Sequence, residues 1–152
     1  MMMTWSDKLA WLVITLWVGA LWVVGYVVAP SLFSQLASDK QLAGNLAGRL
    51  FELVAYIGFA SAFFLIVQRL LRSGWSAFRQ GFFWAVVVML LIAVGGQYYI
   101  QPMMADLKAQ ALPLDVMQSD FAGQFSVVHG VASVGYLVQS LLGVVLIFKS
   151  RQ

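Results

Sequence analysis

Four long apolar runs, almost free of charged residues, constrain the fold of this chain more than any other feature. They cover about residues 9–29, 50–71, 82–100 and 125–148. A helix needs about 20 mostly apolar residues to cross a bilayer. The composition agrees, since 62% of the residues are hydrophobic and 10% are charged, whereas about a quarter are charged in soluble domains. We therefore predict an all-α integral membrane protein with four spans in a single transmembrane domain, residues 1–152.

The positive charges between the runs predict how the spans are oriented. One side of the predicted membrane carries Lys8, Arg69, Arg72, Arg79, Lys149 and Arg151. The other side carries Lys40, Arg49 and Lys108, spread over longer outer segments at 30–48 and 102–124. Because Lys and Arg in short loops stay in the cytoplasm, we expect an antiparallel four-helix transmembrane bundle with N-in/C-in topology. Both termini are therefore expected to be cytoplasmic.

Several function classes are excluded by what the sequence lacks. The chain has no cysteine and a net charge of +3 that forms no basic run, so we expect the lipid bilayer and no nucleic acid as its partner. It contains no glycine-rich phosphate loop and no H-E-x-x-H motif. Asp120, Ser126 and His129 lie close in sequence but lack the strand-to-helix context of a nucleophile elbow. We therefore predict that the protein is not an enzyme and has no catalytic residue.

Polar side chains inside membrane spans are costly and are candidate site residues for that reason. In the predicted topology three helices carry them in the outer half of the bundle. They are Arg49, Glu52 and Tyr56 on the second span, Gln97 and Gln101 on the third, and His129, Ser133 and Tyr136 on the fourth. On each helix the spacing of three, four or seven residues places them on one face. This convergence predicts a polar pocket that binds or passes a small molecule or ion.

Each of these residues also has a structural interpretation. Arg49 and Glu52 can form an ion pair that anchors a helix end at the interface, and the glutamines and serines can bond neighbouring helices. His129 can be a packing residue, although histidine is the one side chain that changes charge near neutral pH. A second function therefore stays open. In it, the chain is a structural or assembly subunit that packs against another membrane protein or a second copy of itself.

Methionine suggests a third, remote function. The chain has seven methionines and one histidine, His129, and thioethers are good ligands for Cu(I). A metal or haem redox protein would use His129 together with methionine. However, one chain offers no second histidine for a haem with two histidine ligands, and Met103 and Met104 are adjacent and cannot share a helix face. We predict no metal site and no cofactor.

Four stretches of the chain resemble a known family. They are WVGALWVVGYVVAPSLF (Trp17–Phe33), AGNLAGRLF (Ala43–Phe51), QPMMADL (Gln101–Leu107) and FSVVHGVASVGYL (Phe125–Leu137). Together they resemble the bacterial relatives of transmembrane protein 205, a family of small four-helix membrane proteins of unassigned function. The resemblance implies a single-domain protein of the bacterial inner (plasma) membrane and, for eukaryotic members, a link to resistance against platinum drugs. It does not imply an enzyme.

Only a few residues carry a recognisable motif of that family. They are Gln101, Pro102, His129, Gly130 and Ser133, and the family assigns them no role. A fainter similarity connects the chain to the membrane domains of copper-resistance D proteins, which carry several histidines and methionines. This chain departs from that pattern because it has one histidine, which argues against transferring copper binding to it.

Overall fold

The structure is a computed structural model that describes residues 4–150. Helices and short helical turns make up most of this range. The long helices, in chain order, are α1 (Trp5–Val23), α2 (Ala29–Gln35), α3 (Lys40–Ser73), α4 (Gly81–Gly95), α5 (Gln101–Ala111) and α6 (Ala122–Lys149). Short π-helical turns join α1 to α2 (η1, Val24–Val28) and α4 to α5 (η3, Gly96–Ile100). Two 3-10 turns, η2 (Gly74–Arg79) and η4 (Val116–Gln118), lie in the connections. No strand occurs within this range.

Four helical segments are long and apolar enough to cross a membrane. They are Trp5–Gln35, Lys40–Arg79, Gly81–Ala111 and Ala122–Lys149. The prediction of an all-α membrane protein with four spans is therefore confirmed at this level. At a rise of about 1.5 Å per residue, a 31-residue segment is roughly 46 Å long, which exceeds the hydrocarbon core of about 30 Å. Each segment is therefore long enough to continue into the polar region beyond the hydrocarbon.

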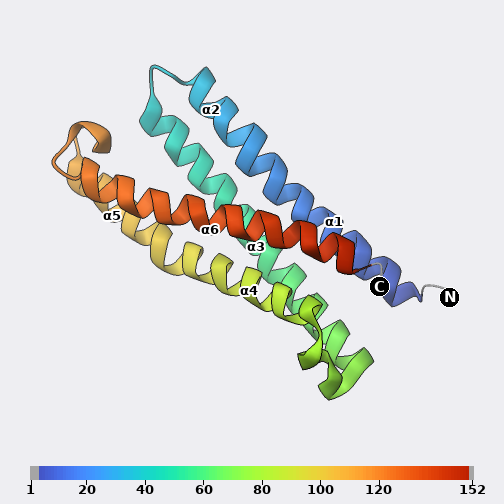
Figure 1. The fold of residues 1–152 in the computed structure, drawn as a ribbon. Helices are drawn as coiled ribbons and strands as arrows, with labels where there is room; N and C mark the ends of the chain where they lie inside the picture. The colour runs from blue at the N-terminus through green and yellow to red at the C-terminus, as the bar shows by residue number, and fades with distance from the viewer. Residues whose placement is uncertain (1–3, 151–152) are drawn as a thin grey trace.

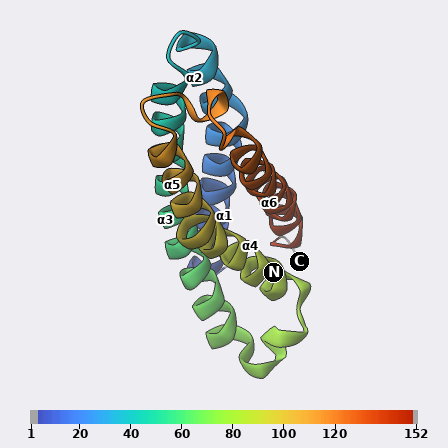
Figure 2. The same ribbon diagram turned by 90° about the vertical axis from the view of Figure 1, so that its left-hand side faces the viewer.

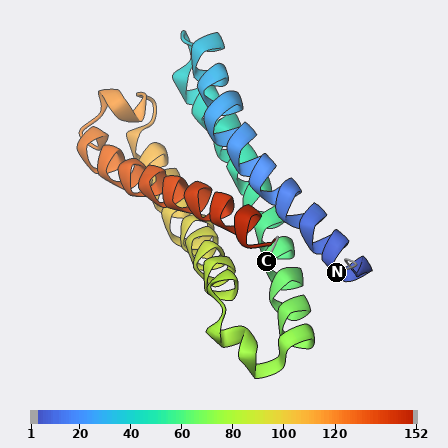
Figure 3. The same ribbon diagram turned by 45° about the vertical axis from the view of Figure 1, so that its right-hand side comes forward.

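The spans pair into two hairpins (Figure 1). The first hairpin consists of α1, α2 and α3, and the second of α4, α5 and α6. α1 packs against α3 and α6, and α4 packs against the same two helices. Figure 3 shows the blue and teal hairpin spreading away from the yellow and orange one toward the turns that follow α2 and α5. Figure 2 shows that the end of α3 projects beyond the other helices.

The core fills the half of the bundle in which α1 begins and α6 ends. Trp17, Leu65, Met89 and Leu146 are fully buried there, one from each span. Gly58 allows this packing, because a Cβ at that position would lie 2.9 Å from Nε1 of Trp17. Small residues at helix contacts let backbones approach closely, which is the main source of packing energy in lipid. We call this region the closed half.

The first and third spans continue past Pro30 and Pro102, which the sequence predicted to end them. The segments at 30–48 and 102–124 are largely helical, with α2 ending at Gln35 and α5 at Ala111. Proline lacks an N–H group and its ring clashes with the carbonyl four residues earlier in an α-helix. A π-turn stands directly before Ala29-Pro30 and before Gln101-Pro102, and in each the residue before proline donates its N–H to the carbonyl five residues back. The wider turn accommodates the ring and the helix continues.

Candidate functional site

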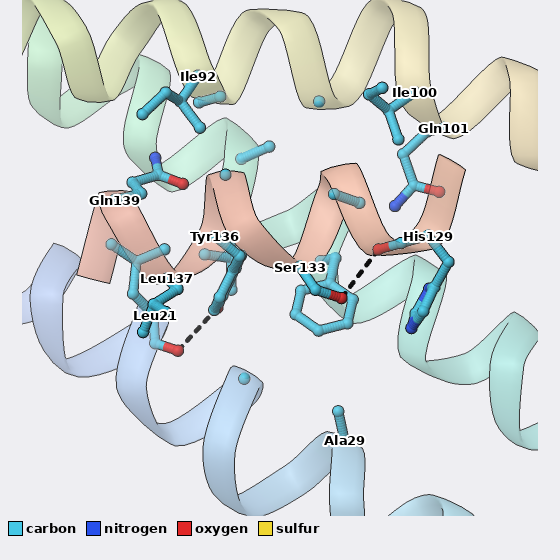
Figure 4. Close-up of a pocket in the computed structure, with 18 of the residues that line it drawn as sticks. Leu21, Ala29, Ile92, Ile100, Gln101, His129, Ser133, Tyr136, Leu137 and Gln139 are labelled. Carbon is cyan, nitrogen blue, oxygen red and sulfur yellow. Dashed lines mark hydrogen bonds between the residues drawn. The ribbon is translucent and has the colours of Figure 1, made fainter. Parts of the chain in front are cut away.

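A cavity of about 720 Å³ lies between the two hairpins, where they spread apart (Figure 4). Its wall is mainly apolar and is formed by residues of all four spans, including Leu21, Phe51, Ile92 and Leu137. Natural ligand sites have cavities of about 300–1,000 Å³ with apolar walls and a few polar groups. The cavity therefore has the size and composition of a small-molecule site.

Both π-turns contribute to this wall. Gly25, Tyr26 and Pro30 line the cavity from the first span, and Gly96, Gln97 and Gln101 line it from the third. π-turns inside α-helices are rare and often occur at functional sites, because they change the direction in which nearby side chains project. The sequence pattern did not predict these turns. The sequence signals only where an α-helical hydrogen bond is lost, at Pro30 and Pro102, and not that a π-turn precedes each proline.

One group of polar residues near the cavity bonds the helices to each other. Tyr136 donates its hydroxyl to the carbonyl of Leu21 at 2.7 Å, which joins α6 to α1 (Figure 4). Tyr26 donates to Oγ of Ser140 at 3.0 Å, and Ser140 donates to the carbonyl of Tyr136 at 2.8 Å. Gln139 is buried and donates to the carbonyl of Met89 at 3.1 Å, which joins α6 to α4.

These four residues, Tyr26, Tyr136, Gln139 and Ser140, form the interhelical network. Tyr136 was a predicted site residue, whereas Tyr26 and Gln139 were not. An amide inside a span is itself a signal of an interhelical bond or a site, so Gln139 could have been found from the sequence. Gly25 makes the contact of Tyr136 possible, because a Cβ there would lie 2.3 Å from Cε1 of that ring.

A second group of polar side chains lines the same cavity without hydrogen-bond partners. Gln97, Gln101 and His129 all line the cavity. Across residues 4–150 the polar side-chain atoms of these three make no hydrogen bond. The imidazole of His129 stacks on the ring of Phe125, with centroids 6.0 Å apart and an interplanar angle of 9°. We call Gln97, Gln101 and His129 the unbonded trio.

Figure 4 shows the positions of two members of this trio. Gln101 projects from the third span toward α6, and His129 lies at the same end of the cavity. Ser133 lies one turn further along α6, and its hydroxyl donates to the main-chain carbonyl of His129 at 2.9 Å. Because the serine hydroxyl donates to the main chain of His129, it makes no hydrogen bond to the imidazole ring. The arrangement offers amide and imidazole groups to a ligand inside an otherwise apolar space.

Three predicted site residues are not part of the cavity wall. Arg49 forms an ion pair with Glu52, and Tyr56 donates its hydroxyl to the other Glu52 oxygen at 3.3 Å. Tyr56 is 47% exposed. All three lie on one face of α3, as their spacing predicts. The neighbouring α3 residues that line the cavity are Phe51, Val54 and Ala55. The helix turns Arg49, Glu52 and Tyr56 away, because residues one position apart differ in direction by about 100°.

The metal interpretation has no cluster to support it. Within the part of the chain that the structure describes, no group of three or more His, Cys, Asp or Glu side chains is placed to hold a metal ion. Met104 lines the cavity that His129 also lines, but one imidazole and one thioether supply fewer ligands than a copper site uses.

Comparisons with known proteins identify a family. Residues 12–113 match the family described as a domain of unknown function, DUF4149. This range covers the first helical segment from residue 12 onward, all of the second and third segments, and both π-turns. Curated proteins and solved structures give no match. Because the family covers about two thirds of its length, this membrane protein with four candidate spans belongs to the DUF4149 family.

Proposed function

We propose that this chain is a non-enzymatic membrane protein that binds a small amphiphilic molecule in the cavity between its hairpins. The unbonded trio is the observation that carries the proposal. Three polar side chains on one wall that make no hydrogen bond to the described residues are free to pair with a ligand or ordered water. The apolar remainder of the wall favours a ligand that is itself largely apolar.

The proposed setting is the bacterial inner membrane, with four antiparallel spans and both termini in the cytoplasm. The distribution of charge supports this orientation. The closed half carries Lys8, Arg69, Arg72, Arg79 and Lys149, whereas Lys40, Arg49 and Lys108 lie toward the other end together with five acidic residues. Under the positive-inside rule, the cavity opens in the outer half of the membrane. The resemblance to the bacterial relatives of transmembrane protein 205 fits this setting and assigns no activity.

The absence of cysteine makes the orientation testable. We would introduce single cysteines at Lys40 and at Ser76, both exposed, and label intact cells with a maleimide that does not cross membranes. Labelling of Lys40→Cys alone, with Ser76→Cys labelled only after lysis, is the expected result. The opposite pattern would place the cavity in the cytoplasmic half and contradict the proposed topology.

A ligand-retention experiment tests the binding function. The full chain, purified in an uncharged detergent, should retain about one amphiphile per protein that mass spectrometry detects. Gly95→Leu should displace it, because Gly95 lines the cavity and an added Cβ there meets nothing within 4 Å. Gly130→Leu is the matched control, since it lies in equally open space on α6 but not on the cavity wall. Equal retention by both variants would contradict the proposal.

The second candidate function is a structural or assembly subunit. The interhelical network supports it, because its polar residues bond α6 to the first and third spans. Under this alternative the cavity would hold bulk lipid or side chains of a partner. The ligand-retention experiment separates the two candidates. Bulk lipid would be retained in an amount that varies between preparations, and Gly95→Leu would not change the retained amount.

A further inference from the structure

A second, smaller cavity adjoins the first one. It has a volume of about 300 Å³ and lies between the start of α3 and α5, where Gln41, Gly44, Asn45 and Lys108 line it. Gln101 and Met104 line both cavities. Because they share this wall, a single elongated molecule could occupy the two cavities together. The wall of the second cavity is the more polar of the two.

Among the described residues, Lys108 is the only charged one on the wall of either cavity. It is partly buried, its Nζ lies 3.4 Å from Oδ1 of Asn45, and it lies 5.9 Å from the centroid of the Phe125 ring. Among the described residues it has no salt bridge. Asp115 acts on it at longer range, but the carboxylate of Asp115 accepts the N–H of Met117 at 2.8 Å.

A partly buried cation without a carboxylate partner is poorly compensated. An oxyanion in the second cavity would pair with Lys108 through a charge-assisted hydrogen bond, which is about twice as strong as a neutral one. The amide groups of Asn45 and Gln101 could donate to the same headgroup. The charge, the polar wall and the shared boundary therefore all favour an acidic group at this position.

We infer that the ligand is an anionic amphiphile whose apolar part fills the larger cavity and whose oxyanion headgroup lies in the smaller cavity against Lys108. This inference rests on the proposed binding function and adds the chemical class of the ligand. Gln101 lies at the junction between headgroup and apolar part. The phosphate or carboxylate belongs to the amphiphile itself and is not a separate free anion.

Native mass spectrometry of the full chain in an uncharged detergent can test this inference. The probes are oleoyl lysophosphatidate, monooleoylglycerol, which has the same chain and no charge, and inorganic phosphate. The wild-type protein should bind the lysophosphatidate at least about tenfold more tightly than monooleoylglycerol, as one charge-assisted bond predicts. Lys108→Gln should remove this preference without changing the affinity for monooleoylglycerol, and Lys108→Arg should keep it. Lys40→Gln, an exposed cation on neither wall, should also keep it.

The outcomes separate the two proposals. Equal binding of both amphiphiles by the wild-type protein, or a preference that survives in Lys108→Gln, would overturn the inference and leave the binding function intact. Tight binding of inorganic phosphate alone would overturn the joint occupation of the two cavities. Failure of both amphiphiles to bind would contradict the binding function itself. Equal thermal midpoints of the variants would exclude misfolding as the cause.

Discussion

The two halves of the bundle contain the same four spans but differ in how those spans meet. In the closed half, one large buried side chain from each span fills the centre, and Arg72 pairs with Asp7 to hold the end of α3 against the start of α1. In the other half, the hairpins spread apart around a cavity of about 720 Å³. The helices there are separated by open space, so they lack the van der Waals contacts that stabilise helix association in lipid.

Polar residues near the cavity show the same division at smaller scale. Tyr136, Gln139 and Ser140 have interhelical or helix-backbone partners, whereas Gln97, Gln101 and His129 have none among the described residues. Residue type does not distinguish the two sets, since both contain glutamine. The difference lies in what each side chain faces. This comparison predicts that the first set contributes to stability and the second to binding.

The largest effect is expected in the closed half. Trp17→Ala should lower the free energy of unfolding by about 3–5 kcal/mol, the usual effect of removing a buried tryptophan. Trp75→Ala is the control, because Trp75 is 88% exposed in η2 and should change stability little. Unfolding in mixed micelles measures both values. Similar small values for the two variants would show that the closed half is not the packed core.

A smaller effect is expected where Tyr136 approaches the first span. Gly25→Ala places a Cβ 2.3 Å from Cε1 of Tyr136, and such overpacking destabilises by about 1–3 kcal/mol. Gly19→Ala lies on the same span with nothing within 4 Å of its Cβ, so its stability should equal or exceed that of the wild type. If both alanine variants unfold at the same midpoint, the close contact between η1 and α6 does not exist.

The smallest stability effect is expected for the network hydroxyl. Tyr136→Phe removes the bond to the Leu21 carbonyl and should lower the free energy of unfolding by about 0.6 kcal/mol, the average for interhelical hydrogen bonds in membranes. Gln97→Leu removes an amide that has no partner and should leave the unfolding free energy unchanged. A greater loss for Gln97→Leu than for Tyr136→Phe would reverse the proposed division between the two sets.

The span count was predictable because a bilayer requires long apolar helices, and this requirement depends on composition alone. The ends of the helices were less predictable. Pro30 and Pro102 indicated the ends of two spans, but a π-turn before each proline lets the helix continue. That outcome depends on hydrogen bonds to carbonyls five residues back, which residue types alone do not specify.

The candidate site was predictable only in part. Helical spacing correctly groups residues on one face of a single helix, as for Arg49, Glu52 and Tyr56, but it does not give the rotation of that face relative to its neighbours. Packing sets this rotation, and it places Phe51 rather than Glu52 on the cavity wall. Spacing also cannot tell whether a side chain such as Tyr136 already has a partner, because the partner lies on a helix more than 100 residues away.

The most direct test of the account is His129→Phe, assayed for stability and for amphiphile binding in the same preparation. Phenylalanine keeps an aromatic ring against Phe125 and removes the hydrogen-bonding nitrogens of the imidazole. We predict an unchanged thermal midpoint and a loss of about threefold to tenfold in affinity for oleoyl lysophosphatidate, as expected for one hydrogen bond. A lower midpoint with unchanged affinity would contradict the account, because His129 would then be a packing residue and the cavity would not be its site of action.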